Sequence, residues 1–254
     1  MGSATPFIAA SKPLKEALKS ANLLKSLKFN TLLLGQPGTG RHTLARLMMP
    51  DAPLVHGDDA NLYTQIEKHP RLIVDRMEKI ASTGKFFQAV KKYGVQIVAI
   101  APEDFAEEYR AFFSVHIVLP PLAERPEDIA PLAEKFRQEV GALFGEGSEA
   151  FVVDLESVDL SENAFSLRRS VMLQYLLTTV DEAEIMRIME SHLASRMEEG
   201  EDLYRRLLYL YEVPLIRAGT KKYRSQLKMS QVFGLNRNTL RKKIQEWRRL
   251  LDEV

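Results

Sequence analysis

Residues 31–48 read Thr-Leu-Leu-Leu-Gly-Gln-Pro-Gly-Thr-Gly-Arg-His-Thr-Leu-Ala-Arg-Leu-Met. The apolar run at the start of this stretch predicts a buried strand, and the spacing from Thr43 to Met48 predicts a helix. Between them, Gly35 and Gly40 stand five positions apart. Glycines at this spacing let backbone N–H groups curl around a phosphate and aim it at the N-terminus of the following helix. The stretch therefore predicts an α/β unit with a phosphate-binding loop.

This loop departs from the working P-loop motif at the two residues that carry the motif's chemistry. The motif has a Lys that reaches the phosphates and then usually a Ser or Thr on magnesium, whereas Arg41 and His42 stand here. Arg41 keeps the charge, but its planar fork is wider than an ammonium. Either the loop retains binding of ATP or ADP with magnesium, or it only connects a strand to a helix. The candidate nucleotide-binding residues are Gly35, Gly38, Thr39, Gly40, Arg41, His42 and Asp75.

Asp75 ends a second apolar run, Arg71 to Asp75, which predicts a strand. In P-loop enzymes an acid here holds magnesium, and a following Glu polarises the attacking water. Arg76 follows Asp75 in this chain, and a cation can neither act as that base nor tolerate the metal. We therefore expect no ATPase activity. Asp75 alone could still bind magnesium, or it could cap a helix or pair with Arg76 or Lys79.

A second motif lies near the end of the chain, between Gln226 and Trp247. Ser230 and Gly234 stand four apart, where two helices that cross sharply need a small side chain and then a residue that tolerates positive φ. Asn236 is then the predicted N-cap of the second helix. The residues expected to face the core recur at helical spacing: Leu240, Ile244, Trp247 and Leu251. The pattern predicts a helix-turn-helix that binds double-stranded DNA.

Charge is distributed unevenly along the chain. The whole sequence has 35 Lys or Arg and 34 Asp or Glu, but residues 217–254 hold 11 of the former and 3 of the latter. The net charge is thus +8 for this segment and −7 for the rest. Such a split favours a nucleic-acid-binding segment on an acidic body that itself avoids DNA.

Composition excludes several classes of protein. The chain has 254 residues, 45% of them hydrophobic, and no cysteine, so disulfides and thiolate metal sites are excluded. Its five histidines lack ligand spacing, and we expect no metal centre. Neither a signal peptide nor an apolar run long enough to cross a membrane is present, and we expect a cytoplasmic protein without membrane contact.

Two stretches resemble known families. Residues 234–244 resemble the DNA-binding end of the bacterial nucleoid protein Fis and of the Fis-type domain that closes the NtrC-like enhancer-binding activators. Residues 115–129 resemble NtrC-like AAA+ domains, and the similarity runs in the right order from about Phe7 to Trp247. The resemblance implies an α/β fold: a P-loop AAA+ parallel sheet flanked by helices, then an all-α lid and an all-α Fis-type helix-turn-helix domain. We expect these domains at residues 1–125, 126–199 and 200–254.

The resemblance also implies roles for the C-terminal residues. Asn236 and Arg237 would reach base edges, and Thr239, Arg241 and Lys242 would hold phosphates. An Arg in the first turn of a recognition helix can pair bidentately with guanine, and basic residues further along neutralise backbone charge. The candidate DNA-binding residues are Gln226, Asn236, Arg237, Asn238, Thr239, Arg241, Lys242 and Lys243. The alternative is a basic amphipathic helix that is merely solvated.

Several family features are missing from this chain. The Gly-Ala-Phe-Thr-Gly-Ala loop that touches sigma-54 does not occur, so contact with sigma-54 is not expected. Ala106 and Phe112 stand where arginine fingers belong, with Arg110 as a possible substitute. Phe165 replaces an arginine that reads the γ-phosphate, although Arg168 or Arg169 could compensate.

Together these patterns predict a cytoplasmic, sequence-specific DNA-binding transcriptional regulator that acts as a homodimer and is not an enzyme. Two other functions are compatible with the sequence. One is an ATP-binding or ATP-hydrolysing sigma-54-dependent activator. The other is a nucleotide-free scaffold for dimerisation or for a regulatory protein partner.

Overall fold

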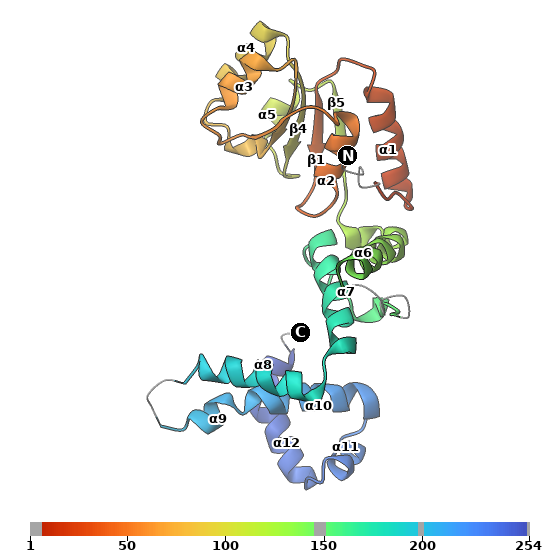
Figure 1. The fold of residues 1–254 in the computed structure, drawn as a ribbon, viewed down its shortest axis with the longest axis vertical. Coiled ribbons are helices and arrows are strands. Elements are labelled where there is room, and N and C mark those ends of the chain that lie inside the picture. The colour runs from red at the N-terminus through yellow and green to blue at the C-terminus, as the bar shows by residue number, and fades with distance from the viewer. Residues whose placement is uncertain (1–6, 145–150, 198–200, 253–254) are drawn as a thin grey trace. The chain divides into compact units, whose positions relative to one another are not determined.

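A computed structural model describes residues 7–144, 151–197 and 201–252 of the chain (Figure 1). The chain divides into two compact units, Met1–Thr179 and Val180–Val254. Each unit has a hydrophobic core of its own. Within the described ranges, no helix is both long enough and apolar enough to cross a membrane.

The first unit is built on a five-stranded parallel sheet with strand order β2-β3-β4-β1-β5. The strands are β1 (Thr31–Leu34), β2 (Leu54–His56), β3 (Arg71–Asp75), β4 (Gln96–Ala101) and β5 (Val115–Val118). In the central register Leu33 lies between Ile100 and Ile117. The predicted parallel α/β sheet is therefore confirmed. Strand β2 was not predicted, because three residues carry too little periodicity.

Alternate residues of the strands face two separate hydrophobic layers. Leu33, Ile73 and Val98 pack with helices α1 (Lys12–Leu24) and α2 (Arg41–Met48). Their neighbours Leu32, Leu72 and Ile97 pack with α3 (Leu62–Lys68) and α4 (Thr83–Tyr93). Figure 1 shows the two pairs of helices on opposite faces of the sheet. A three-layer α/β sandwich results.

The helical spacing of apolar residues between Pro13 and Lys28, which includes Leu27, predicts a helix over that range, but helix α1 is shorter. It starts after Ser11, whose side chain caps the helix, and ends at Leu24. Leu14, Ala17, Ala21 and Leu24 are buried as expected, but Leu27 lies beyond the helix and is 43% exposed. Only the part of the apolar stripe that reaches the sheet is helical.

The helices after the sheet form the lid. A 3-10 turn at Pro126–Asp128 leads into α6 (Ile129–Phe144), which packs against α7 (Ala164–Thr179). Phe136 and Val140 of α6 meet Val171 of α7 in the core. The helical spacing from Pro126 to Phe144 also predicts Leu143 on the buried face, but this residue is 63% exposed. Residues 145–148, which the sequence predicts as a loop, lie outside the described residues. Shorter elements of this unit are α5 (Glu107–Arg110) and 3-10 turns at Met77–Lys79, Leu122–Glu124 and Leu155–Ser157.

Among its described residues, the second unit has helices and no strand. Its helices are α8 (Glu182–Ala194), α9 (Leu203–Leu207), α10 (Tyr209–Tyr223), α11 (Gln226–Val232), α12 (Arg237–Glu246) and α13 (Arg248–Asp252). Asp181 and Glu184 form a capping box at the start of α8. The unit begins at Val180, so α8 belongs to it, whereas we had expected α8 to complete the lid.

The core of the second unit contains Ile216, Met229 and Leu240. Ile244, Trp247 and Leu251 pack around it, as their helical spacing predicted. The apolar stripe between Leu203 and Leu215 predicts a helix that buries Tyr211 and Pro214, but both residues are exposed on α10. The inner face of α10 is formed by Glu212, Val213, Ile216 and Gly219.

Candidate functional site

The loop between β1 and α2 has the backbone of a phosphate cradle. Gly35, Gly38 and Gly40 have φ angles of 145°, 80° and 106°, which side chains other than glycine rarely adopt. Helix α2 begins at Arg41, two residues earlier than predicted. The N–H groups of Arg41 and His42 therefore lie in its first turn, where a helix supplies no acceptor. This geometry suits an anion at the start of α2.

The lid is fastened to this loop through Asn163. A Cβ atom on Gly38 would lie 2.5 Å from the carbonyl oxygen of Glu162, so the two backbones touch. The side-chain amide of Asn163 donates to the Pro37 carbonyl at 2.9 Å, and its Oδ1 accepts from the N–H of Leu122 at 2.6 Å. Asn163 is buried and has a φ of 57°. Its place in the fold was not predicted from the sequence.

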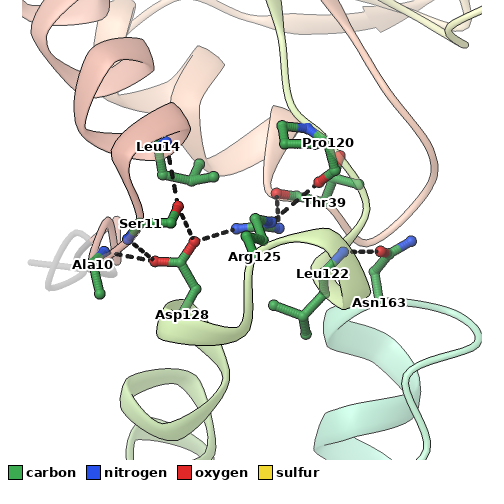
Figure 2. A network of polar contacts seen from close by, with 9 residues as sticks. All are labelled: Ala10, Ser11, Leu14, Thr39, Pro120, Leu122, Arg125, Asp128 and Asn163. Carbon is green, nitrogen blue, oxygen red and sulfur yellow. Dashed lines mark hydrogen bonds and ion pairs between the residues drawn. The ribbon is translucent and has the colours of Figure 1, made fainter.

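A buried polar network joins three distant segments around Asp128 (Figure 2). Ser11 Oγ donates to Asp128 Oδ2 at 2.6 Å, and the N–H groups of Ala10 and Ser11 donate to Oδ1. Arg125 pairs with Asp128 at 3.2 Å and donates to the Thr39 carbonyl at 2.8 Å. Burial opposes ionisation of Asp128, but the hydrogen bonds from Ser11, Ala10 and Arg125 lower its pKa below the ordinary value.

A pocket of about 480 Å³ opens beside the glycine loop. One wall is apolar and contains Phe7, Ile8, Leu132 and Phe136. Cationic side chains come from Arg41, Arg125, Lys135 and Arg168. The volume lies within the range of small-molecule sites, and apolar walls with a few placed charges are typical of them. An apolar ring system joined to phosphates fits this combination.

Arg41 lies in the place of the P-loop lysine but is directed toward the sheet. Its Nη1 donates to the Ala101 carbonyl, at the end of β4, at 2.5 Å, and the residue is only 9% exposed. Burial lowers the pKa of Arg41, against the opposing effect of Asp75 and Glu78. The charge is therefore held at the carboxyl edge of the sheet while the residue still lines the pocket.

Asp75, the predicted magnesium ligand, is bound by two histidines. Its Oδ2 lies 3.1 Å from Nε2 of His42 and 3.3 Å from Nδ1 of His56. Burial alone would raise the pKa of Asp75, but the hydrogen bond and charge of His42, the Arg76 N–H and the charge of His56 lower it. From the sequence, Arg76 or Lys79 was considered as the ion-pair partner of Asp75. In the structure, Nη1 of Arg76 lies 3.9 Å from Oδ2 of Asp58 instead.

The arginines considered as substitutes for family arginines have local partners. Arg110 donates to the carbonyls of Glu103 and Phe105 and pairs with Glu107 at 3.0 Å. Arg168 lines the pocket and pairs with Glu139 at 3.0 Å. Phe165 is 59% exposed and also lines the pocket.

The helix, turn and helix predicted near the C-terminus are present as α11 and α12. Ser230 is buried at their crossing, Gly234 has a φ of 64°, and Asn236 Oδ1 accepts from the Asn238 N–H at 2.9 Å. All three predictions about this turn are confirmed. The exposed candidates for DNA contact are Gln226, Asn236, Arg237, Asn238, Thr239, Arg241 and Lys242.

Lys243 differs from the other candidates because its ammonium is bonded to the buried carboxylate of Glu212 on α10. That pair fixes α12 against α10 and leaves Lys243 only partly exposed. Glu212 was not identified from the sequence. The sequence does hold a signal for its role, because Glu212 is a charged residue within an apolar stripe.

The parallel sheet, the glycine loop and the helices that follow form an α/β fold with a loop of the P-loop type. The sequence matches no known family model and no curated protein. Among solved structures, the chain is similar to NtrX from Brucella abortus in complex with ATP, with a TM-score of 0.61 and 15% identity over 95% of this chain and 69% of NtrX. For the ADP complex of NtrX the TM-score is 0.59 and the identity 16%, over 95% and 68% of the two chains. At this identity the likeness is one of fold.

Proposed function

We propose that the protein is a sequence-specific DNA-binding transcriptional regulator whose AAA+ unit binds ATP or ADP without hydrolysing it. The observation that carries the DNA-binding part is the surface of α12. Arg237, Arg241 and Lys242 are exposed there, while Leu240 is buried in the core. A helix held in this way can enter a major groove with its charged side outward.

The electrostatics of the chain support this proposal. The excess of positive charge lies within residues 217–254, and the remainder of the chain is acidic. Phosphate neutralisation by Lys and Arg supplies much of the affinity of a protein for DNA. Because the acidic remainder repels DNA, binding would be restricted to the helices of the second unit.

The surface of α8 supports a homodimer. Ile185, Met186 and Ile188 are all more than half exposed, and α8 buries no side chain among the described residues. An exposed apolar helix face of this kind marks a site of contact with another protein surface. A second copy of the chain would also give two recognition helices for two half-sites, which increases affinity and fixes their register.

DNA binding is tested by selection from a random duplex library, followed by binding measurements at several salt concentrations. We expect a two-fold related consensus site that is bound about 10³-fold or more tightly than random DNA. Equal affinity for all sequences would contradict the proposal and would favour a partner-binding scaffold. Sedimentation equilibrium of the free protein tests the dimer.

Nucleotide binding is supported by the glycine cradle and by the pocket beside it. NtrX, which has the similar fold, was solved in complex with ATP and with ADP. Loss of hydrolysis is inferred from Arg76, which occupies the position of the water-activating acid and is exposed and positively charged. Calorimetry with each nucleotide tests binding, and phosphate release tests turnover. Sustained release would favour an ATP-hydrolysing activator.

A further inference from the structure

We propose that the nucleotide site works without a divalent metal, with Arg41 supplying positive charge that Mg²⁺ supplies in working P-loop enzymes and His42 occupying the carboxylate that would hold the ion. This inference rests on the proposed nucleotide binding and concerns the chemical form of the ligand: free ATP or ADP rather than the magnesium complex. It is carried by the surroundings of Asp75.

The carboxylate of Asp75 is already engaged. Its Oδ2 is contacted by His42 at 3.1 Å and by His56 at 3.3 Å, from two different elements of the fold. The residue is buried, so an ion at this oxygen would compete with both imidazoles. Mg²⁺ also requires near-ideal octahedral geometry and gives up its water reluctantly. Asp75 is therefore a poor ligand for Mg²⁺ in this fold.

The second protein ligand is also absent. At position 42 a working P-loop has a hydroxyl oxygen, whereas this chain presents an imidazole nitrogen. Magnesium selects oxygen ligands, and nitrogen suits softer metals. The next residue after Asp75 is the exposed cation Arg76, which adds repulsion. In the described part of the chain, no cluster of three or more His, Asp or Glu side chains is arranged to hold a metal ion.

The charge of the phosphates can be balanced by the protein instead. Arg41 and His42 line the pocket at the start of α2, next to the N–H groups of the cradle. Lys135 and Arg168 line the same pocket. Arg presents several donors in a fixed fork and binds phosphate oxygens in the way that a metal bridges them. Glu139 also lines the pocket and lies 3.0 Å from Arg168 and 3.9 Å from Lys135, but the cationic side chains outnumber this acid, so the lining can balance phosphate charge without a further positive ion.

The test is calorimetry of the whole protein with ATP and with ADP, each in excess Mg²⁺ and again in excess EDTA. We expect the dissociation constants in the two buffers to agree within about threefold, or to favour EDTA. A loss of affinity of about tenfold or more in EDTA would overturn the inference while leaving nucleotide binding intact. Absence of binding in both buffers would overturn the nucleotide function itself, so the two failures are distinguishable.

A direct metal titration gives a second measurement. Mn²⁺ is a spectroscopic substitute for Mg²⁺ with similar ligand preferences, and its binding to the protein is followed by water proton relaxation. We expect any binding that occurs to be unchanged in the Asp75→Asn variant. Mn²⁺ binding that is lost in Asp75→Asn would place a metal at this carboxylate and overturn the inference.

A double variant, His42→Thr with His56→Ala, restores the hydroxyl and frees the carboxylate. We expect its ATP affinity to become dependent on magnesium, by about tenfold or more between the two buffers. His192→Ala, on the exposed surface of α8, is the matched control and should behave as the parent protein. A double variant that stays indifferent to magnesium would overturn the role of the two imidazoles in excluding the metal.

Discussion

The indole Nε1 of Trp247 donates a hydrogen bond at 2.7 Å to Oε2 of Glu212, a buried carboxylate on α10. The other oxygen of Glu212 accepts from Lys243. One acid thus fixes two residues at the C-terminal end of the proposed recognition helix. It stabilises the orientation of α12 rather than contacting DNA.

We predict that Glu212→Ala lowers the free energy of unfolding of the second unit by about 1–3 kcal/mol, because two donors lose their buried acceptor. The chain has a single tryptophan, Trp247, so urea unfolding followed by its fluorescence reports on this unit directly. Glu246→Ala, which removes an exposed acid on α12, is the control. An unchanged midpoint in Glu212→Ala would show that the carboxylate contributes no net stability.

Arg237→Ala is predicted to cost about 1–3 kcal/mol of binding to the selected DNA site and to relax specificity at one base. The reason is the position of Arg237 in the first turn of α12, where an exposed guanidinium can reach a base edge. Binding to the selected site and to random DNA should be compared in parallel. An equal loss on both would refute the base contact.

Lys242→Ala is predicted to weaken binding to all sequences alike and to reduce the slope of log affinity against log salt by about one. Lys242 is exposed further along α12, where it can neutralise backbone charge but does not lie in the first turn. Lys15→Ala removes the same charge from an exposed position on α1 and should leave the slope unchanged. A sequence-dependent loss would instead assign Lys242 to base recognition.

We predict that the protein loses stability in acid because Asp128 becomes protonated. The pKa of Asp128 in the folded protein lies below its value of about 3.9 in the unfolded chain. The ionised carboxylate therefore contributes its full stabilisation above a pH of about 3.9, and this stabilisation is lost as the pH falls through the pKa of the folded state. Unfolding of the parent protein, followed by circular dichroism, should therefore depend more steeply on pH below about 4 than that of Asp128→Asn. At neutral pH the variant should be destabilised by about 3 kcal/mol, because Arg125 loses its buried partner. Parallel pH profiles would contradict the assigned role.

Two variants of Asn163 separate its side chain from its backbone. Asn163→Gly removes the hydrogen bonds to Pro37 and Leu122 but tolerates the positive φ, whereas Asn163→Ala removes the bonds and adds strain. We expect both to lower the melting temperature of the first unit, and Ala to cost about 1 kcal/mol more than Gly. Thermal melts of the two proteins measure the difference. If Gly were equal to the parent, the amide would not be fastening the lid.

Much of the fold could be predicted because its local signals are strong. The spacing of Gly35 and Gly40 predicted the phosphate-binding loop, and the turn required positive φ at Gly234; all three glycines have positive φ in the structure. The apolar run at Arg71–Asp75 gave the bounds of β3. In each case the chemistry of a short segment determines its conformation.

The rest depended on contacts between distant segments. His56 could not be placed beside Asp75 because β2 is only three residues long and its pairing with β3 brings the two side chains together. Glu212 is buried only because Lys243 and Trp247 approach it from another helix. The helical spacing of Leu27 and Leu143 continued past the surface that the sheet and lid can cover, so both were wrongly expected inside.

The bond between Ser11 and Asp128 has a consequence for synthesis of the chain. Ser11 caps α1, and its hydroxyl and backbone N–H are both bonded to a residue that the ribosome adds more than a hundred positions later. Helix α1 is therefore translated well before the residue that accepts the hydrogen bonds of its cap. Until the lid segment emerges, the hydroxyl and backbone N–H of Ser11 can donate only to water, so the segment around Ser11 and the lid complete their folding together.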